Sequence, residues 1–300
     1  TPFLQLANTH DYLLFFTDRG RVFRCRVFDL PPDQSRNSRG TPVNNLGFNI
    51  EQREQIHEMI SVSSLIEDTY LVIVTKKGQV KRMHLPLLKN MNRSGLRAFN
   101  LKNDDELVGA SLVSEHQDIV IVTAAGLSIR VASNNIRSTQ RNAGGVRGIN
   151  LNQRDEVVAM DVVDEDGYLL IVGKKGRGKL TAMRHYKTQR RGGKGLITLK
   201  VTTGRTGTGK VADAVVVSSE ITDDDQGNIM LVTEKAQILR TNLKEIRRTG
   251  RNAQGVKIHD VSSGDNVSKI RVIDPAKQKN ENEDEKNITD SIKDSDNNVE

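Results

Sequence analysis

Five copies of one short pattern divide the chain at nearly constant spacing. In each copy an aliphatic run of strand length ends in a tight polar turn, and a loop glycine follows 17 to 20 residues later. The turns are Asp18–Gly20, Lys76–Gly78, Ala124–Gly126, Lys174–Gly176 and, with the glycine replaced, Glu234–Ala236. The loop glycines are Gly40, Gly95, Gly145, Gly195 and Gly255. The turn and the loop glycine keep nearly the same separation in all five copies. The chain is therefore predicted to be one repeat architecture whose core continues from unit to unit.

The aliphatic runs have the composition of β-strands and are too short for helices. They are Leu13–Thr17, Leu71–Thr75, Ile119–Thr123, Leu169–Gly173 and Ile229–Thr233. A more polar strand follows each turn, and further apolar stretches bring the expected number to four short strands per unit. Such units of about 45 to 60 residues predict an all-β, propeller-like ring of about five four-stranded blades. A β-solenoid is the alternative fold, but its coils are shorter.

The pattern also divides the chain into an ordered part, 1–275, and a tail. The expected units are 1–48, 49–103, 104–152, 153–203 and 204–275. In this division Glu106–Val113 and Glu156–Val163 open the third and fourth units, and the polar stretch Asn49–Met59 is an insertion. Residues 276–300 hold four Lys and eight Asp or Glu with almost no large apolar residue, so we expect a disordered acidic tail. This tail either keeps the chain soluble or competes with an acidic ligand for basic surface.

Composition argues against several kinds of site. No apolar run reaches 18 residues and the first residues do not form a signal peptide, so we expect a cytoplasmic protein. The single cysteine, Cys25, and six histidines without ligand spacing predict neither disulfides nor a metal site. Gly204–Lys210 has the spacing of a phosphate-binding P-loop, but Val211 stands where the hydroxyl ligand of Mg²⁺ would be required. We therefore expect no catalytic residue, metal or cofactor in this chain.

Positive charge collects in the glycine loops. Removing the tail raises the net charge from +7 to 7 + 4 = +11, and the loop Lys187–Gly195 alone holds four cations and three glycines. The candidate binding residues in the loops are Lys187, Arg190, Arg191, Lys194, Arg36, Arg39, Arg93, Arg97, Arg141, Arg147, Arg251 and Lys257. A second series, four residues after the turn in every unit except the fourth, adds Arg82 and Arg130. Equivalent positions of a radial repeat lie at equivalent places around a ring, so these cations are predicted to form a belt on its perimeter. Ordinary balanced surface charge is the alternative, but the loops contain almost no acidic residue.

A belt of cations and glycine amides suits phosphate groups, and the lack of aromatic residues in the loops disfavours base stacking on single strands. We therefore expect duplex DNA as the ligand. Bending a duplex through half a turn over ~30 bp costs roughly 14 kcal/mol for a persistence length of ~150 bp. If each phosphate contact contributes on the order of 1 to 1.5 kcal/mol, ten or more contacts are required. Several loops must therefore act together, in a sequence-tolerant and salt-dependent manner.

Two motifs resemble a known family. Gln189–Gly195, QRRGGKG, resembles the box found in the C-terminal domain of the A subunit of bacterial DNA gyrase, a type IIA topoisomerase, and the phrase Leu71–Arg82 resembles the blades of that domain. The likeness extends from Leu13 to about Ile273. It implies a β-pinwheel, a propeller variant whose blades exchange strands, which wraps double-stranded DNA. In that family the box belongs to the first blade, whereas here it lies in the fourth unit. The likeness therefore implies a fragment whose first blade would precede Thr1.

The resemblance also implies partners and a cellular setting. The whole enzyme introduces negative supercoils with ATP and Mg²⁺, which are held in other domains or polypeptides, so no catalytic residue is carried over. The implied partners are the N-terminal breakage-reunion domain of the same polypeptide and the gyrase B subunit in an A2B2 assembly, in the bacterial cytoplasm at the nucleoid. Two alternatives stay open. One is the equivalent domain of the topoisomerase IV A subunit, and the other is a propeller that scaffolds proteins.

Overall fold

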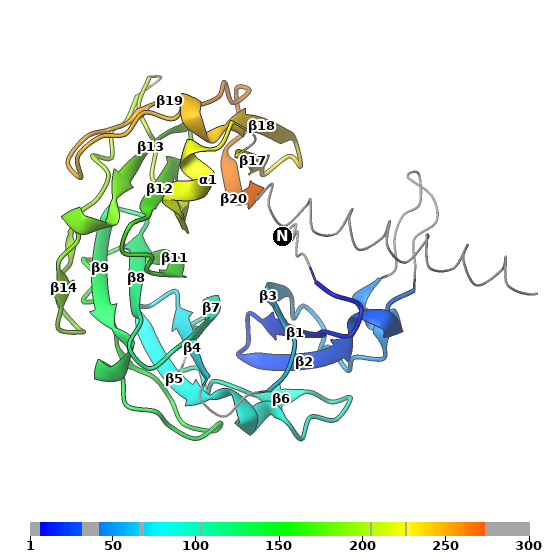
Figure 1. The fold of residues 1–300 in the computed structure, drawn as a ribbon. Coiled ribbons are helices and arrows are strands. Elements are labelled where there is room, and N and C mark those ends of the chain that lie inside the picture. Colours follow the sequence, from blue (N-terminus) through cyan, green and yellow to red (C-terminus); the bar gives the residue numbers. More distant parts are fainter. Residues whose placement is uncertain are drawn as a thin grey trace, which may run out of the picture.

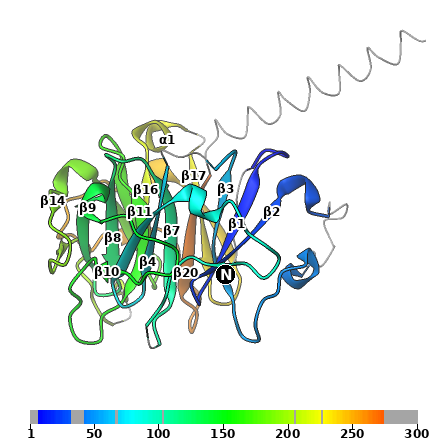
Figure 2. The ribbon, with the colours of Figure 1, turned by 90° about the horizontal axis from the view of Figure 1, so that it is seen from below.

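Strands form nearly all the regular structure of this chain. The computed structural model describes residues 7–31, 42–65, 69–102, 104–204, 206–225 and 227–273. Within them the chain forms β-strands, short 3-10 turns and one short helix, α1 (Ser219–Asp223). Figure 1 shows five blades arranged as an open ring, and Figure 2 shows the same ring as a disc seen from its edge. The predicted all-β, five-bladed architecture is confirmed. The expected acidic tail, 276–300, lies outside the described residues.

Each blade is built from three antiparallel strands that are consecutive except for short exchanged segments. The first two form a hairpin, and the third runs along the inner edge of the first. The five sets of strands are β1 (Tyr12–Thr17), β2 (Arg21–Arg26) and β3 (Ile56–Val62); β4 (Tyr70–Thr75), β5 (Gln79–His84) and β7 (Leu107–Val113); β8 (Asp118–Thr123), β9 (Leu127–Ala132) and β11 (Val157–Val162); β12 (Tyr168–Gly173), β13 (Arg177–Ala182) and β16 (Val211–Val217); and β17 (Asn228–Thr233), β18 (Ile238–Asn242) and β20 (Val267–Ile273).

The outer strand of a blade comes from the following repeat. The exchanged pairs are β6 (Leu96–Arg97) with β2, β10 (Val146–Arg147) with β5, β15 (Leu196–Ile197) with β9 and β19 (Val256–Lys257) with β13. A further short strand, β14 (Thr188–Gln189), pairs in parallel with β9. The sheet of the fifth blade contains three strands in the described part of the chain. This exchange between neighbours is the pinwheel arrangement that the resemblance implied.

The expected unit boundaries are displaced by one strand. Glu106–Val113 was expected to open the third unit, but β7 pairs with β4 and completes the second blade. In the same way β11 completes the third blade by pairing with β8. Asn49–Met59, expected to be an insertion, contains the start of β3 of the first blade. A periodic pattern has no intrinsic starting point, and only the strand pairing shows where a blade begins.

The hydrophobic core lies between the blades. Successive side chains of a strand point to opposite faces of a sheet, so Leu71 and Ile73 pack against the first blade, whereas Val72 and Val74 pack against the third. The third and fourth blades are joined through Val120 and other residues in the same way. Strands covered on both faces read as continuous apolar runs. This arrangement explains why the aliphatic runs of the sequence show no alternation.

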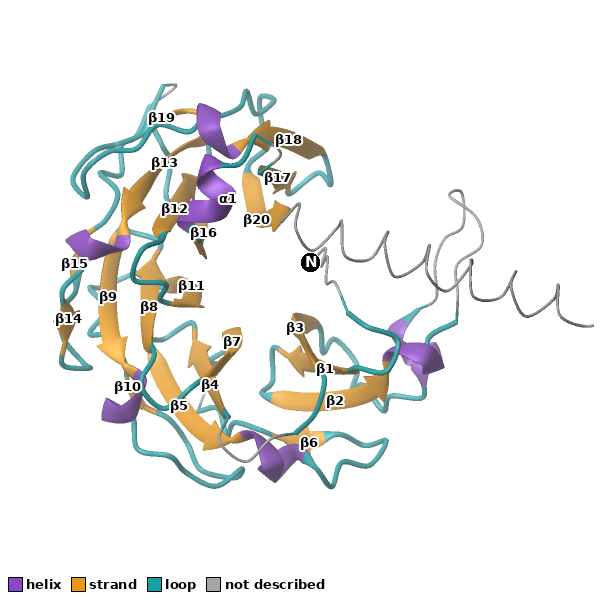
Figure 3. Ribbon diagram, viewed as in Figure 1, coloured by secondary structure: helices purple, strands orange, loops and turns teal. Residues whose placement is uncertain are grey.

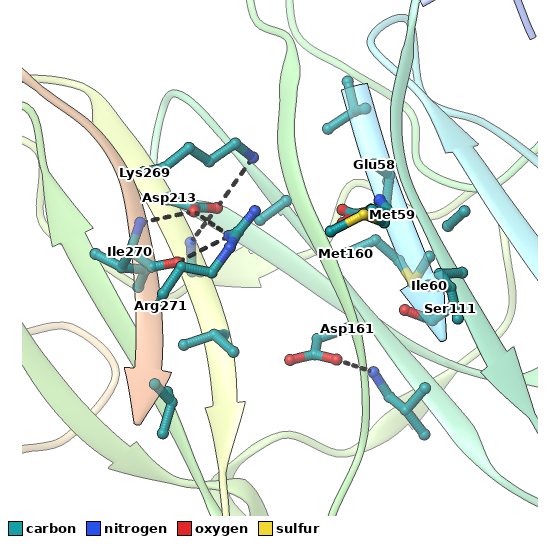
Figure 4. Close-up of a pocket in the computed structure, with 18 of the residues that line it drawn as sticks. Glu58, Met59, Ile60, Ser111, Met160, Asp161, Asp213, Lys269, Ile270 and Arg271 are labelled. Atoms are coloured by element: carbon teal, nitrogen blue, oxygen red, sulfur yellow. Dashed lines mark hydrogen bonds and ion pairs between the residues drawn. The ribbon is translucent and has the colours of Figure 1, made fainter. Parts of the chain in front are cut away.

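The five inner strands line a cavity of about 490 Å³ at the centre of the ring, and all of them except β7 contribute charged residues to it. Asp161 of β11 accepts the backbone N–H of Val216 on β16 at 2.8 Å. Asp213 of β16 accepts that of Ile270 on β20 at 3.0 Å (Figure 4). These carboxylates therefore tie neighbouring blades together at their inner edges. Burial raises the pKa of Asp161 to about 6, because the backbone hydrogen bonds offset only part of the desolvation of its charge.

Asp161→Asn is expected to change how stability depends on pH. The pKa of Asp161 is higher in the folded protein, so between about pH 4 and 6 the folded state holds a proton that the unfolded chain has lost. The ionised group therefore weakens the fold as pH rises through 6, and the stability of the variant relative to the unchanged protein should increase by on the order of 1 kcal/mol between pH 5 and 8. Thermal unfolding of both proteins at pH 5, 6.5 and 8 measures the difference. A variant that is less stable by the same amount at all three values would contradict it.

Candidate nucleic-acid interface

Strand exchange holds the glycine loops on the outer edge of the ring. Figure 3 shows the short strands β6, β10, β15 and β19 around this edge. The third, fourth and fifth loops each begin by pairing in parallel with the outer hairpin strand of the preceding blade. The parallel contacts are Arg82 with Ser138, β9 with β14, and Leu180 with Arg248. Each loop then ends antiparallel to the same strand. A loop fixed at both ends presents its middle residues outward.

Glycine is required where two of these loops cross the neighbouring strand. Gly195 and Gly255 both have φ of +77°, a left-handed conformation that other residues adopt with strain. A Cβ atom at these positions would lie 2.6 Å from the carbonyl oxygen of Ser128 and 2.4 Å from that of Gly178. The loops can therefore lie close against the blade only because a side chain is missing. This explains the constant spacing of the loop glycines.

Most of the predicted cations are exposed on these loops. The exposed ones are Arg93, Arg97, Arg147, Lys187, Arg190, Arg191, Lys194 and Lys257, and the half-buried ones are Arg141 and Arg251. Lys257 forms an ion pair with Asp260 at 2.6 Å. The other nine make no ion pair with a carboxylate among the residues that the structure describes. Arg36 and Arg39 lie outside the described residues.

Two members of the predicted belt lie inside the protein instead. Arg82 is 4% exposed; its guanidinium carbon lies 3.6 Å from the centre of the Tyr70 ring and one of its N–H groups donates to the Ser133 carbonyl. Arg130 is 8% exposed and forms ion pairs with Asp118, at 2.6 Å, and with Glu165. The start of the next loop covers both residues. Arg82 and Arg130 are therefore removed from the candidate surface.

Hydrogen bonds at its base and near its tip hold the loop with the sequence QRRGGKG in place. At its base the Tyr186 hydroxyl lies 2.6 Å from Oγ1 of Thr198, and both residues are buried. Burial raises the pKa of Tyr186, so the phenol stays neutral. Near the tip the Gly192 N–H donates to the Gly148 carbonyl at 2.6 Å, and Asn150 donates to the Gly193 carbonyl at 2.8 Å. The fourth loop therefore rests on the third.

Comparison with known proteins identifies the family. The family model of the DNA gyrase C-terminal domain, a β-propeller, matches residues 11–63, 69–114, 117–164, 167–218 and 227–274. The chain belongs to the DNA gyrase C-terminal domain family. Each matched segment contains the three antiparallel strands of one blade.

Curated relatives and solved structures agree with this membership. The chain is 44% identical over 253 residues to the DNA gyrase A subunit of Clostridium acetobutylicum and 39% identical over 267 residues to that of Deinococcus deserti. These matches cover 84% and 87% of the chain but only 29% and 32% of the relatives. The C-terminal domain of DNA topoisomerase IV superposes with a TM-score of 0.76 at 25% identity, covering 89% of this chain and 80% of that one. A DNA gyrase A C-terminal domain gives 0.75 at 24% identity, covering 89% and 84%, and this likeness concerns the fold alone.

Sequence reasoning missed two exposed cations of this gyrase C-terminal domain. Arg137 and Arg247 lie eight residues before Gly145 and Gly255, the position that Lys187 occupies before Gly195. The register of the repeat could have identified both. In the described part of the chain no group of His, Cys, Asp and Glu residues is arranged to hold a metal ion, and no helix is long and apolar enough to cross a membrane.

Arg130→Met is expected to lower the stability of this gyrase C-terminal domain. The substitution leaves Asp118, whose side chain is 11% exposed, without its cation, and breaking such a pair costs about 3 kcal/mol. Arg147→Met, on the exposed perimeter, is the matched control and should change stability by less than about 0.5 kcal/mol. Urea unfolding measures both. Equal stability of the two variants would show that Arg130 is not a structural residue.

Proposed function

We propose that this chain binds duplex DNA around its outer edge and bends it, as the wrapping domain of the DNA gyrase A subunit. The observation that carries the proposal is the succession of exposed and half-buried cations on equivalent loops, from Arg93 to Arg251, which have no carboxylate partner in the described residues. Guanidinium and ammonium groups together with glycine N–H groups recognise phosphates rather than bases. Binding is therefore sequence-tolerant and depends steeply on salt.

The surface supports this function better than protein scaffolding. In the described part of the chain the exposed large apolar residues are Phe28, Ile197 and Ile238, which are 56%, 50% and 64% exposed. They lie on different blades and form no continuous apolar patch. A protein-binding face would combine such residues in a contiguous area with aromatic anchors. The perimeter instead combines cations and glycines.

The proposed cellular role follows from the family. The domain supports ATP-dependent negative supercoiling by DNA gyrase, and the ATP site, Mg²⁺ and the cleaving residues belong to other domains or polypeptides. Its partners are the N-terminal breakage-reunion domain of the same polypeptide and the gyrase B subunit in an A2B2 assembly, in the bacterial cytoplasm at the nucleoid. Topoisomerase IV is the second candidate, because the chain resembles its C-terminal domain in fold as closely as it resembles that of gyrase. The gyrase assignment has the support of the closer identity to gyrase relatives and of the exposed QRRGGKG loop.

Neutralising the fourth loop should weaken DNA binding strongly. Arg190→Gln, Arg191→Gln and Lys194→Gln together are expected to raise the Kd for a 40 bp duplex on the order of a hundredfold, because three phosphate contacts are lost. The slope of log K against log salt should fall by about 3. A salt series in a filter-binding assay measures both quantities.

The matched control removes the same charge near the ring centre. Lys76→Gln, Lys174→Gln and Lys210→Gln change residues that line an inner cavity of about 500 Å³. This variant should bind DNA within about twofold of the unchanged protein. Equal losses in the two triple variants would mean that net charge, and not the perimeter, drives binding. Wrapping itself is tested by the linking number of relaxed circles that are religated with and without the protein, and an unchanged linking number would contradict it.

A further inference from the structure

Two lysines are buried beneath the loops of the perimeter. Lys81 of β5 is 1% exposed and Lys179 of β13 is 0% exposed. Each lies three residues after its turn glycine, Gly78 or Gly176, so the two occupy the same register in the second and fourth blades. Fully buried lysines are rare in proteins unless they are paired. Their presence at one repeated position requires a physical reason.

Both ammonium groups bind the backbone of the following repeat's loop. Nζ of Lys81 donates to the carbonyl oxygens of Arg141 at 2.5 Å and Ala143 at 3.0 Å in that loop, and to that of Ala98 at 2.7 Å in its own repeat. Nζ of Lys179 donates to the carbonyl oxygens of Gly250 at 2.5 Å and Arg251 at 2.6 Å. Arg141 and Arg251 occupy equivalent places in their loops, four residues before the loop glycine. The lysines therefore fix the backbone at these two candidate DNA-binding arginines.

The core of a blade does not require a lysine at this register. The other blades have Phe23, Ile129 and Leu239 there. Phe23 lies against Gly95 and Ile129 against Gly193, so both contact glycines of the loops that cover them. An apolar residue would also avoid the cost of burying an ammonium group without a carboxylate. Lys81 and Lys179 therefore serve something other than packing.

We infer that Lys81 and Lys179 are positioning residues, which hold the third and fifth loops in the conformation that presents Arg141 and Arg251 to DNA. This inference rests on the proposed function. The side chains of Arg141 and Arg251 are half-buried, and that of Arg251 also donates to the Ile197 carbonyl at 3.3 Å. The backbone of each residue sets the direction in which its side chain leaves the loop. Hydrogen bonds to the carbonyl groups of these two residues fix that direction before DNA binds.

The contacts of Lys81 make its loop sensitive to pH. Three carbonyls surround its Nζ, and only the ammonium form has three N–H donors; the neutral amine would turn a lone pair toward one of them. Burial lowers the pKa of Lys81 to about 8, and burial with the nearby charge of Arg251 lowers that of Lys179 to about 8. The ring of Phe99 lies 5.7 Å from Lys81 Nζ, and no acidic group faces either lysine among the described residues.

Stability and DNA affinity should respond to this titration in opposite directions. The pKa of each lysine is lower in the folded state, so between about pH 8 and 10 the unfolded chain binds more protons and the fold becomes more stable as pH rises. Over the same range Lys81 loses a donor and its loop loosens. A residue that supported only the fold would move both quantities together.

The test uses Lys81→Ile and Lys179→Ile, since isoleucine is the residue of the third blade, with Lys174→Ile at the ring centre as control. At pH 7 each buried-site variant should bind a 40 bp duplex about five- to tenfold more weakly, and the control within about twofold. Between pH 7 and 9 the unchanged protein should lose about fivefold in affinity without a fall in Tm, whereas Lys81→Ile should show no such loss.

Amide hydrogen exchange of residues 138–145 tests the anchoring without DNA. Exchange should be faster in Lys81→Ile at pH 7, and raising the pH should accelerate it beyond the intrinsic chemical rate in the unchanged protein alone. If Lys81→Ile does not fold, the test is made on the unchanged protein alone, by comparing its DNA affinity, Tm and amide exchange at pH 7 and pH 9. Unchanged exchange, or equal pH profiles for the two proteins, would overturn the inference. Anchored loops in a protein that binds no duplex would contradict the proposed function alone.

Discussion

Backbone pairing between one blade and the next repeat's loop is the interaction on which this structure depends. Unpaired outer edges would leave each sheet open to pairing with other chains, and a strand such as β10 (Val146–Arg147) is too short to be stable without a partner. Exchange solves both problems, because each loop covers its neighbour's edge and is fixed by it. The same contacts that complete a blade therefore set the positions of the cations. Loss of one blade's edge would also displace the surface of the next.

The sequence was sufficient to predict the class of fold and the number of repeats. An aliphatic run indicates a strand buried between two blades, and a loop glycine indicates a close approach of two backbone segments. Both features depend on the residues at one place in the chain. The phase of the blades was not predictable, because the third strand pairs with a hairpin that precedes it by many residues. β3 illustrates the difficulty. All but one of its residues are only half-buried beside the ring centre, so Asn49–Met59 lacks the apolar signal of the other strands.

The perimeter could be predicted in outline, because the loop cations repeat with the loop glycines. The residues that were wrongly placed on it share one cause. Exposed Arg190 and buried Arg130 are indistinguishable by residue type, since burial of an arginine depends on partners from distant strands. Asp118 and Glu165 provide them for Arg130, and the Tyr70 ring does so for Arg82. Lys81 and Lys179 look like ordinary members of basic strands for the same reason. Their acceptors are backbone carbonyls, which no side-chain pattern reports.

The arrangement of ion pairs directs the positive charge of the molecule outward. Near the ring centre Lys76 pairs with Glu106 at 3.1 Å, and Lys174 pairs with Glu234 at 3.3 Å. Inner strands of neighbouring blades lie close together, so like charges there would repel, and Lys76 and Lys174 each have an acid beside them. Outer loops diverge as the radius increases, and their cations can stay unpaired at a smaller electrostatic cost. A radial repeat with this distribution concentrates its field on the perimeter, where a polyanion can contact several loops at once.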